Sequence, residues 1–201
     1  GRQDLRQRRQ LFRADRRLSL GFSIGEISAT AVVLDLYGRP RATHTVEFPL
    51  DSSRETILNA ARHAYEEALA AAGGAVEGVG FAIPGILDRA TGSMRYSVNL
   101  PAFNGFPIRP TLERLFGCPI RMEESSRAVA MAEKWFGIGR TERSFVAVEW
   151  GVGIGMALVH EGRLFGGNRD FLGEIGHIRV VENGRRCRCG KRGCLEVYAS
   201  E

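Results

Sequence analysis

The sequence predicts an α/β fold, and two observations favour this class. Three β-rich runs, at about residues 18–24, 28–35 and 41–48, open the chain at the spacing of a hairpin meander. After them, stretches with helical periodicity alternate with strand-like runs, which is the pattern of α/β proteins. The hydrophobic fraction of 44% and the charged fraction of 25% are those of an ordinary globular chain with an apolar core.

Local signals predict each element of the first half. The turn sequences GE and LYGRP separate the three opening runs, so we expect an antiparallel three-stranded meander. Ser52-Ser53-Arg54-Glu55 then has the form of a capping box. Apolar side chains recur at helical spacing from Ile57 to Ala72, and Gly73-Gly74 ends the predicted helix. The run VEGVGFAIPG predicts a buried strand that ends at a Pro-Gly turn.

The second half repeats this alternation. We expect a short helix near 108–116, a strand at 118–123 and a helix across 126–136. Two further strands, at 144–150 and 153–160, follow, and the sequence EGR turns the chain after the second of them.

The positive charge of the chain is concentrated at its start. The net charge is +5, and residues 1–17 hold seven arginines against two aspartates, so that the other 184 residues hold 21 basic and 21 acidic groups. We interpret residues 1–17 as a basic arm or linker, in contact with solvent rather than with phosphates. The start of the chain lacks the apolar core of a secretory signal, and no apolar run approaches the roughly 20 residues that span a bilayer. We therefore expect a cytoplasmic protein with no membrane partner.

One histidine and three cysteines, His177, Cys187, Cys189 and Cys194, have the spacing H-x9-C-x-C-x4-C. Three cysteines cannot all pair in disulfides, whereas three thiolates and an imidazole form a common tetrahedral zinc set. Four protein ligands leave no open position on the ion, so the zinc is expected to be structural. A DNA-binding zinc ribbon is disfavoured, because such ribbons usually have two CxxC knuckles. The basic side chains of the loop either offset the negative charge of the zinc–thiolate centre or face solvent.

Two motifs, GEIGH and CRCGKRGCLE, resemble the ROK (repressor, ORF, kinase) family of bacterial transcriptional repressors and sugar kinases. The resemblance extends over about residues 18–201 and implies the actin-like, ribonuclease H-like sugar-kinase fold. It implies a first α/β lobe at 18–123 and the start of a second α/β lobe, with the zinc loop, at 124–201. Because the family continues beyond the zinc loop, we expect a truncated form of the fold.

The resemblance also implies a sugar site. The residues that match Glu174, His177 and Glu196 contact sugar hydroxyls in the family, and the residue that matches Asn99 often does so too. Glu124 stands where an asparagine of the same site is expected. Carboxylates and an imidazole on a rigid base suit polyol recognition, because each fixes the direction of a hydroxyl by hydrogen bonds.

The aspartates of the family's kinases are missing. Ser23 occupies the position of the aspartate that handles metal and phosphate, and Ser125 that of the general base. A serine hydroxyl accepts no proton near neutral pH, and loss of a general base costs roughly 10²–10⁴-fold in rate. Serine is also a good N-cap, so we expect Ser125 to cap the helix that follows it.

The sequence therefore favours the effector-sensing domain of a ROK-type transcriptional regulator (NagC/XylR-like) without kinase activity. The alternatives are an ATP-dependent, glucokinase-like sugar kinase with atypical catalytic residues and a zinc-stabilised interaction module without a small ligand. The expected partners are a sugar or sugar derivative, DNA through a helix-turn-helix absent from this chain, and a second copy of the protein in a homodimer or larger homo-oligomer.

Overall fold

A computed structural model describes residues 17–74, 76–166 and 173–200. Apart from Arg17, the predicted basic arm lies outside the described residues. The described residues divide into two compact units, one within residues 1–81 and 109–121 and the other within residues 82–108 and 122–201. The lobe boundary expected after residue 123 remains a prediction for the whole protein, since in this structure segment 82–108 groups with the residues after 121.

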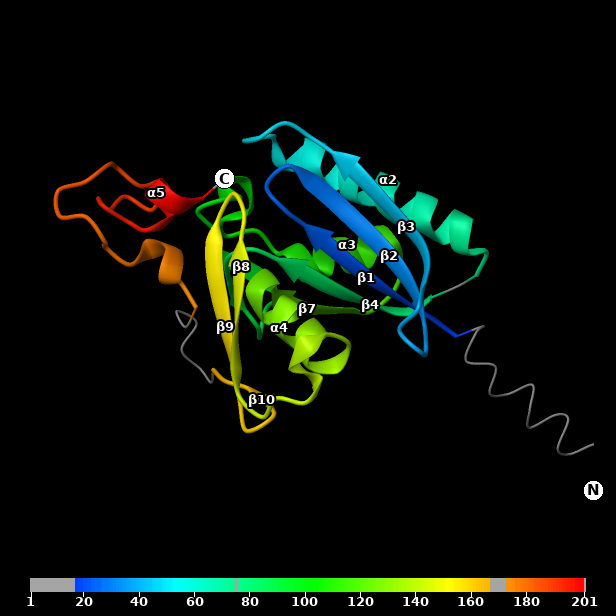
Figure 1. Cartoon of the computed structure of the whole chain (residues 1–201). Helices are drawn as coiled ribbons and strands as arrows, with labels where there is room; N and C mark the ends of the chain where they lie inside the picture. The colour runs from blue at the N-terminus through cyan, green and yellow to red at the C-terminus, as the bar shows by residue number, and fades with distance from the viewer. Residues whose placement is uncertain (1–16, 75, 167–172, 201) are drawn as a thin grey trace, which may run out of the picture. The chain divides into compact units, whose positions relative to one another are not determined.

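A five-stranded sheet with the order β3-β2-β1-β4-β7 organises the first unit (Figure 1). The predicted antiparallel meander is confirmed, and its strands are β1 (Leu18–Ile24), β2 (Ser28–Asp35) and β3 (Pro40–Glu47). In β2 every second residue is buried, as expected of a strand with one face on a core. The other two strands are β4 (Val76–Ile83) and β7 (Ile120–Glu124).

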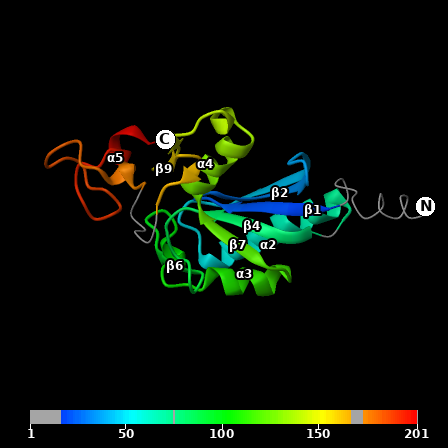
Figure 2. The same ribbon diagram turned by 90° about the horizontal axis from the view of Figure 1, so that it is seen from below.

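Helices α2 (Arg54–Ala72) and α3 (Ile108–Phe116) lie on one face of this sheet (Figure 2). Tyr65 of α2 stacks on Phe116 at a centroid distance of 4.1 Å, and Phe22 of β1 meets the edge of Phe116 at 5.3 Å. The Tyr65 hydroxyl donates a hydrogen bond to the Phe116 carbonyl (3.1 Å), which satisfies a buried polar group inside this aromatic cluster.

The start of α2 corrects the predicted capping box. Ser53, not Ser52, is the N-cap, and its hydroxyl accepts a hydrogen bond from the backbone amide of Thr56 (3.2 Å). Ser52 instead donates to the carbonyl of Pro49 (2.6 Å). The helix therefore begins one residue later than the motif indicated. Its predicted end is confirmed, with Gly73 in the left-handed region at φ 65°.

The second unit contains a three-stranded sheet with the order β10-β9-β8. Its strands are β8 (Phe145–Trp150), β9 (Ile154–His160) and β10 (Arg163–Leu164), and α4 (Ser125–Trp135) packs on it. Ala130, Ala157 and Val159 form the buried centre of that contact. The remaining elements are the hairpin β5 (Ile86–Asp88) and β6 (Ser93–Tyr96), the short helices η1 (Pro101–Phe103), η2 (Ile138–Arg140) and η3 (Ile175–His177), and α5 (Glu196–Ala199).

The sequence did not predict the hairpin β5–β6, because strands of three and four residues are too short to show a hydrophobic period. None of the helices in the described segments is long and apolar enough to cross a membrane.

Candidate metal centre and ligand site

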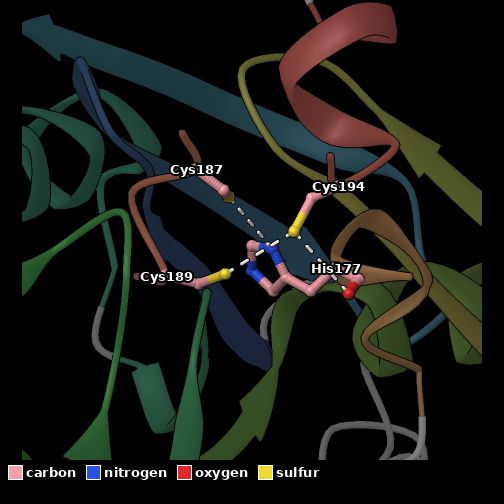
Figure 3. A group of neighbouring side chains, drawn as sticks. All are labelled: His177, Cys187, Cys189 and Cys194. Carbon is pink, nitrogen blue, oxygen red and sulfur yellow. Dashed lines mark hydrogen bonds between the residues drawn. The ribbon is translucent and has the colours of Figure 1, made fainter. Parts of the chain in front are cut away.

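His177, Cys187, Cys189 and Cys194 converge in the second unit (Figure 3). Their ligand atoms all lie within 4.8 Å of one another, and all three cysteines are free thiols. The Cys189 and Cys194 sulfurs are 3.7 Å apart, and the Cys187 sulfur lies 3.7 Å from His177 Nδ1. Two sulfurs at ~2.3 Å from one tetrahedral zinc would be ~3.8 Å apart. The four residues could therefore hold a metal ion without rearrangement, and the donor set is one that Zn²⁺ prefers.

The metal loop, residues 177–196, is held by backbone hydrogen bonds and by glycine. The amides of Val180 and Val181 both donate to the Gly193 carbonyl, at 2.7 and 3.1 Å. Gly193 has φ 74°, and a Cβ there would collide with the Val181 carbonyl oxygen. Burial, reinforced by the neighbouring thiols, raises the pKa of Cys194 to about 12, so a bound metal must displace the thiol proton.

Close packing on β9 positions the GEIGH segment. The Met156 amide donates to the Gly173 carbonyl (2.9 Å). A Cβ at Gly173, where φ is 115°, would meet the Met156 carbonyl oxygen, and one at Gly176 would meet that of Ile154. Both glycines therefore let the segment approach β9 closely enough to place Glu174 and His177 beside this strand.

His177 lies between two carboxylates. Its Nε2 atom is 3.7 Å from Glu174 Oε2, and its Nδ1 atom is 4.0 Å from Glu196 Oε1. With Nδ1 beside Cys187 and Nε2 toward Glu174, the ring presents one nitrogen to the metal position and the other to a carboxylate. This arrangement is typical of metal-bound histidines, whose second nitrogen is oriented by an outer carboxylate.

Glu196 and Asn99 meet at the turn between β8 and β9. Glu196 is 8% exposed, and its Oε2 atom accepts a hydrogen bond from the Ile154 amide (3.0 Å). A Cβ built at Gly153 would lie 2.6 Å from Asn99 Nδ2 and 3.4 Å from Glu196 Oε2. The absence of a side chain at Gly153 thus lets both polar groups approach the same turn.

Burial and neighbouring charges raise the pKa of two carboxylates of this region, Glu124 and Glu174. Burial, with the charges of Glu123 and Glu174, raises the pKa of Glu124 to about 7, against the opposing effect of Arg127 and Arg89. The pKa of Glu174 is also raised, by desolvation and by Glu196, against the effect of His177, although 45% of its side chain remains exposed. Since the charge of Glu174 contributes to the raised pKa of Glu124, the two groups influence one another's ionisation.

Ser125 does not cap α4, which corrects a second expectation. Glu124 is the N-cap residue, and its own side chain makes no capping hydrogen bond. The Ser125 hydroxyl instead donates to Glu149 Oε2 of β8 at 2.9 Å, and the Ser126 hydroxyl donates to the same oxygen at 2.9 Å. Glu149 was missed, because a glutamate between Val148 and Trp150 predicts only a solvent-facing position.

The structure brings Glu174, His177 and Glu196 together and places Asn99 against Glu196, and the charge of Glu174 is felt at Glu124. Ser23 is exposed on β1 opposite Thr30 in the first unit. The role of each of these residues toward a ligand remains a prediction.

The chain belongs to the ROK family, whose sequence profile matches residues 19–201. It is 40% identical over 122 residues to a glucokinase of Thermotoga maritima, an alignment that covers 61% of this chain and 38% of that enzyme. It is also 30% identical over 187 residues to a putative xylose repressor of Caldicellulosiruptor, covering 92% of this chain and 47% of the repressor.

A solved structure of a ROK family glucokinase from Streptomyces griseus, in complex with glucose and AMPPNP, superposes with a TM-score of 0.80. That comparison has 32% identity and covers 91% of this chain and 57% of the enzyme. The predicted sugar-kinase fold is thereby confirmed, and the chain spans about half the length of the relatives that it matches. These relatives include both enzymes and repressors, so family membership alone does not assign one of the two functions.

Proposed function

We propose that this chain is the sugar-sensing, effector-binding domain of a ROK-family transcriptional regulator, with a structural zinc ion and without kinase activity. The observation that carries the proposal is Ser125 at the start of α4, where the family's kinases have the aspartate that serves as general base. The Ser125 hydroxyl donates a hydrogen bond to Glu149 and, unlike a carboxylate, is not by itself a general base near neutral pH. The extensive similarity to a putative xylose repressor supports the regulator assignment.

The proposed zinc ion would be held by His177, Cys187, Cys189 and Cys194. Four protein ligands leave no position for a water or a substrate, so the ion would supply rigidity and not Lewis acidity. It would fix His177 and the segment leading to Glu196, and thereby orient both side chains toward a ligand. The donor atoms lie within 4.8 Å of one another, which supports this role.

The proposed ligand is a sugar or sugar derivative. Glu174, Glu196 and Glu124 would accept hydrogen bonds from its hydroxyl groups, while the Asn99 amide can both donate and accept. Binding would change the affinity of the whole regulator for DNA, through a helix-turn-helix outside the described residues, and we propose that the whole regulator is a cytoplasmic homo-oligomer.

A specific observation also favours the alternative of a sugar kinase, namely the 40% identity to a glucokinase. In that case the proton of the sugar hydroxyl would have to reach Glu149 through Ser125, since the two oxygens are 2.9 Å apart.

Two assays test the proposal. Thermal denaturation with a panel of sugars should show at least one stabilising ligand, because binding to the folded state adds about 2.7 kcal/mol at a hundredfold excess over Kd. Incubation with ATP, Mg²⁺ and the same sugars should yield no sugar phosphate, with the Thermotoga glucokinase as a positive reference. Reproducible phosphorylation would establish the kinase, and a panel without any thermal shift would favour the interaction module.

A further inference from the structure

Glu149 occupies an unexpected row of β8. The side chains of Phe145, Ala147 and Glu149 are half-buried, whereas Val146, Val148 and Trp150 on the opposite face are 50%, 49% and 58% exposed. The glutamate therefore lies on the more buried face of β8, while two valines and a tryptophan face solvent. This is the reverse of the usual pattern, in which apolar side chains are buried and charged ones are exposed. Burial of apolar surface therefore does not explain the position of Glu149.

The contacts of Glu149 are made with the start of α4. Its Oε2 atom accepts the hydroxyl hydrogens of Ser125 and Ser126, each at 2.9 Å. Gly155 is the residue paired with Glu149 across the hairpin, and a Cβ there would collide with the Ser126 hydroxyl. A missing side chain on β9 thus makes room for the serine to reach the carboxylate on β8.

The side chains of this cluster have used their hydroxyl hydrogens within the cluster. Each serine has one hydroxyl hydrogen, and both hydrogens are given to Glu149. The hydrogen bonds from the two serines both use Glu149 Oε2, so the side chains of this cluster present acceptor atoms to a ligand. The nearby cations Arg89 and Arg127 are both held by Glu123, at 2.6 and 3.0 Å.

We propose that Glu149 is a specificity-determining residue of the ligand site. It supplies from β8 the carboxylate that the chain lacks at position 125, and together with Ser125 and Ser126 it accepts a hydrogen bond from the ligand. The group that it selects is a hydroxyl or an amine, and a phosphate or carboxylate substituent is rejected there by the negative charge. This inference rests on the proposed sugar-binding function of the same site.

The pairing has a consequence for stability that needs no ligand. An aspartate placed at position 125 would stand about 3 Å from Glu149, and two carboxylates so close cannot both ionise without cost. Ser125→Asp should therefore lower the Tm by roughly 4–8 °C, and Glu149→Gln in the same chain should restore most of that loss. The exposed Glu142→Gln is the matched control for the second change and should restore nothing.

Calorimetric titration of the metal-loaded chain tests the ligand role. The probes are glucose, xylose, glucosamine and glucose 6-phosphate, each with the wild type, Glu149→Gln and Glu142→Gln. The glutamine keeps an oxygen that accepts from the two serines, so the Tm of Glu149→Gln should be preserved. Because the variant lacks the charged acceptor, its affinity for the sugar that binds should fall roughly ten- to hundredfold. Glu142→Gln should bind like the wild type, and glucose 6-phosphate should bind more weakly than glucose.

The outcomes separate the two claims. Unchanged affinity in Glu149→Gln, or preferred binding of glucose 6-phosphate, overturns the role of Glu149 and leaves the sugar site intact. An absence of binding by every probe overturns the sugar-binding function and the ligand role with it. Additive effects of Ser125→Asp and Glu149→Gln on the Tm overturn the pairing itself, whatever the titrations show.

Discussion

The metal loop and the start of α4 both hold polar side chains at defined positions, but they do so with partners at very different distances along the chain. In the metal loop the four ligands lie within eighteen consecutive positions, 177–194, and the loop's own backbone bonds hold them together. At the start of α4, Ser125 and Ser126 instead depend on Glu149, which lies on another element 23 and 24 residues away. This difference explains why the spacing of the four ligands predicts the metal site, whereas no local sequence pattern predicts the contact between Glu149 and the two serines.

The largest expected effect comes from the metal loop. Cys194→Ser removes one of four ligands, and we expect loss of the bound metal and a Tm lower by roughly 10 °C or more, because metal binding and folding of such loops are coupled. Elemental analysis and differential scanning calorimetry measure the two effects. Cys118→Ser is the matched control, since Cys118 lies outside the cluster. Full metal content in Cys194→Ser would refute the four-ligand site.

Backbone crowding in the same loop gives the next effect. Gly193 and Gly190 both have positive φ, 74° and 89°, but a Cβ would meet the Val181 carbonyl only at Gly193, whereas nothing lies within 4 Å at Gly190. Gly190→Ala should cost about 1 kcal/mol of unfolding free energy from strain alone, and Gly193→Ala about 2–4 kcal/mol. Urea denaturation compares them, and equal losses would contradict the close approach of the two segments.

Ionisation at the start of α4 gives a smaller, pH-dependent effect. The pKa of Glu124 is raised to about 7, so the folded chain binds this proton more tightly than the unfolded chain does. The associated stability is present at low pH and is lost as pH rises through about 7. Glu124→Gln should therefore stabilise the protein at pH 8 by on the order of 1–2 kcal/mol after solvent screening, and much less at pH 5. Thermal denaturation at both pH values measures this, and an equal effect at both would contradict the raised pKa of Glu124.

The start of α2 provides the smallest effect and a reference for the start of α4. Ser53→Ala should cost about 1 kcal/mol, because it removes the hydroxyl that caps α2, whereas Ser52→Ala should cost clearly less. Chemical denaturation of the two variants gives the answer. A larger loss of unfolding free energy in Ser52→Ala than in Ser53→Ala would show that Ser52 is the cap, as the capping-box motif predicted.

Much of the fold could be predicted from the sequence. Strands and helices with a clear period, such as β2 and α2, have the expected bounds to within one or two residues, because the alternation of apolar side chains determines which face is buried. The convergence of His177 with the three cysteines followed from their spacing, since few chemistries need that set.

The failures share a cause. Two serines and a threonine stand within five residues at the start of α2, and local preference alone did not decide which serine would be the cap. At α4 the expected cap failed because a carboxylate from β8 takes the Ser125 hydroxyl, a contact that depends on how strand and helix pack. Long-range polar partners of this kind leave no periodic signal in the chain.

The central claim is that this chain binds a sugar without phosphorylating it. The most direct test incubates the metal-loaded chain with ATP, Mg²⁺ and the sugar that raises its Tm most, and follows the sugar by mass spectrometry. We expect the sugar to remain unchanged while it saturates the protein at equilibrium. Accumulation of a sugar phosphate, with ATP consumed in equal amount, would contradict it.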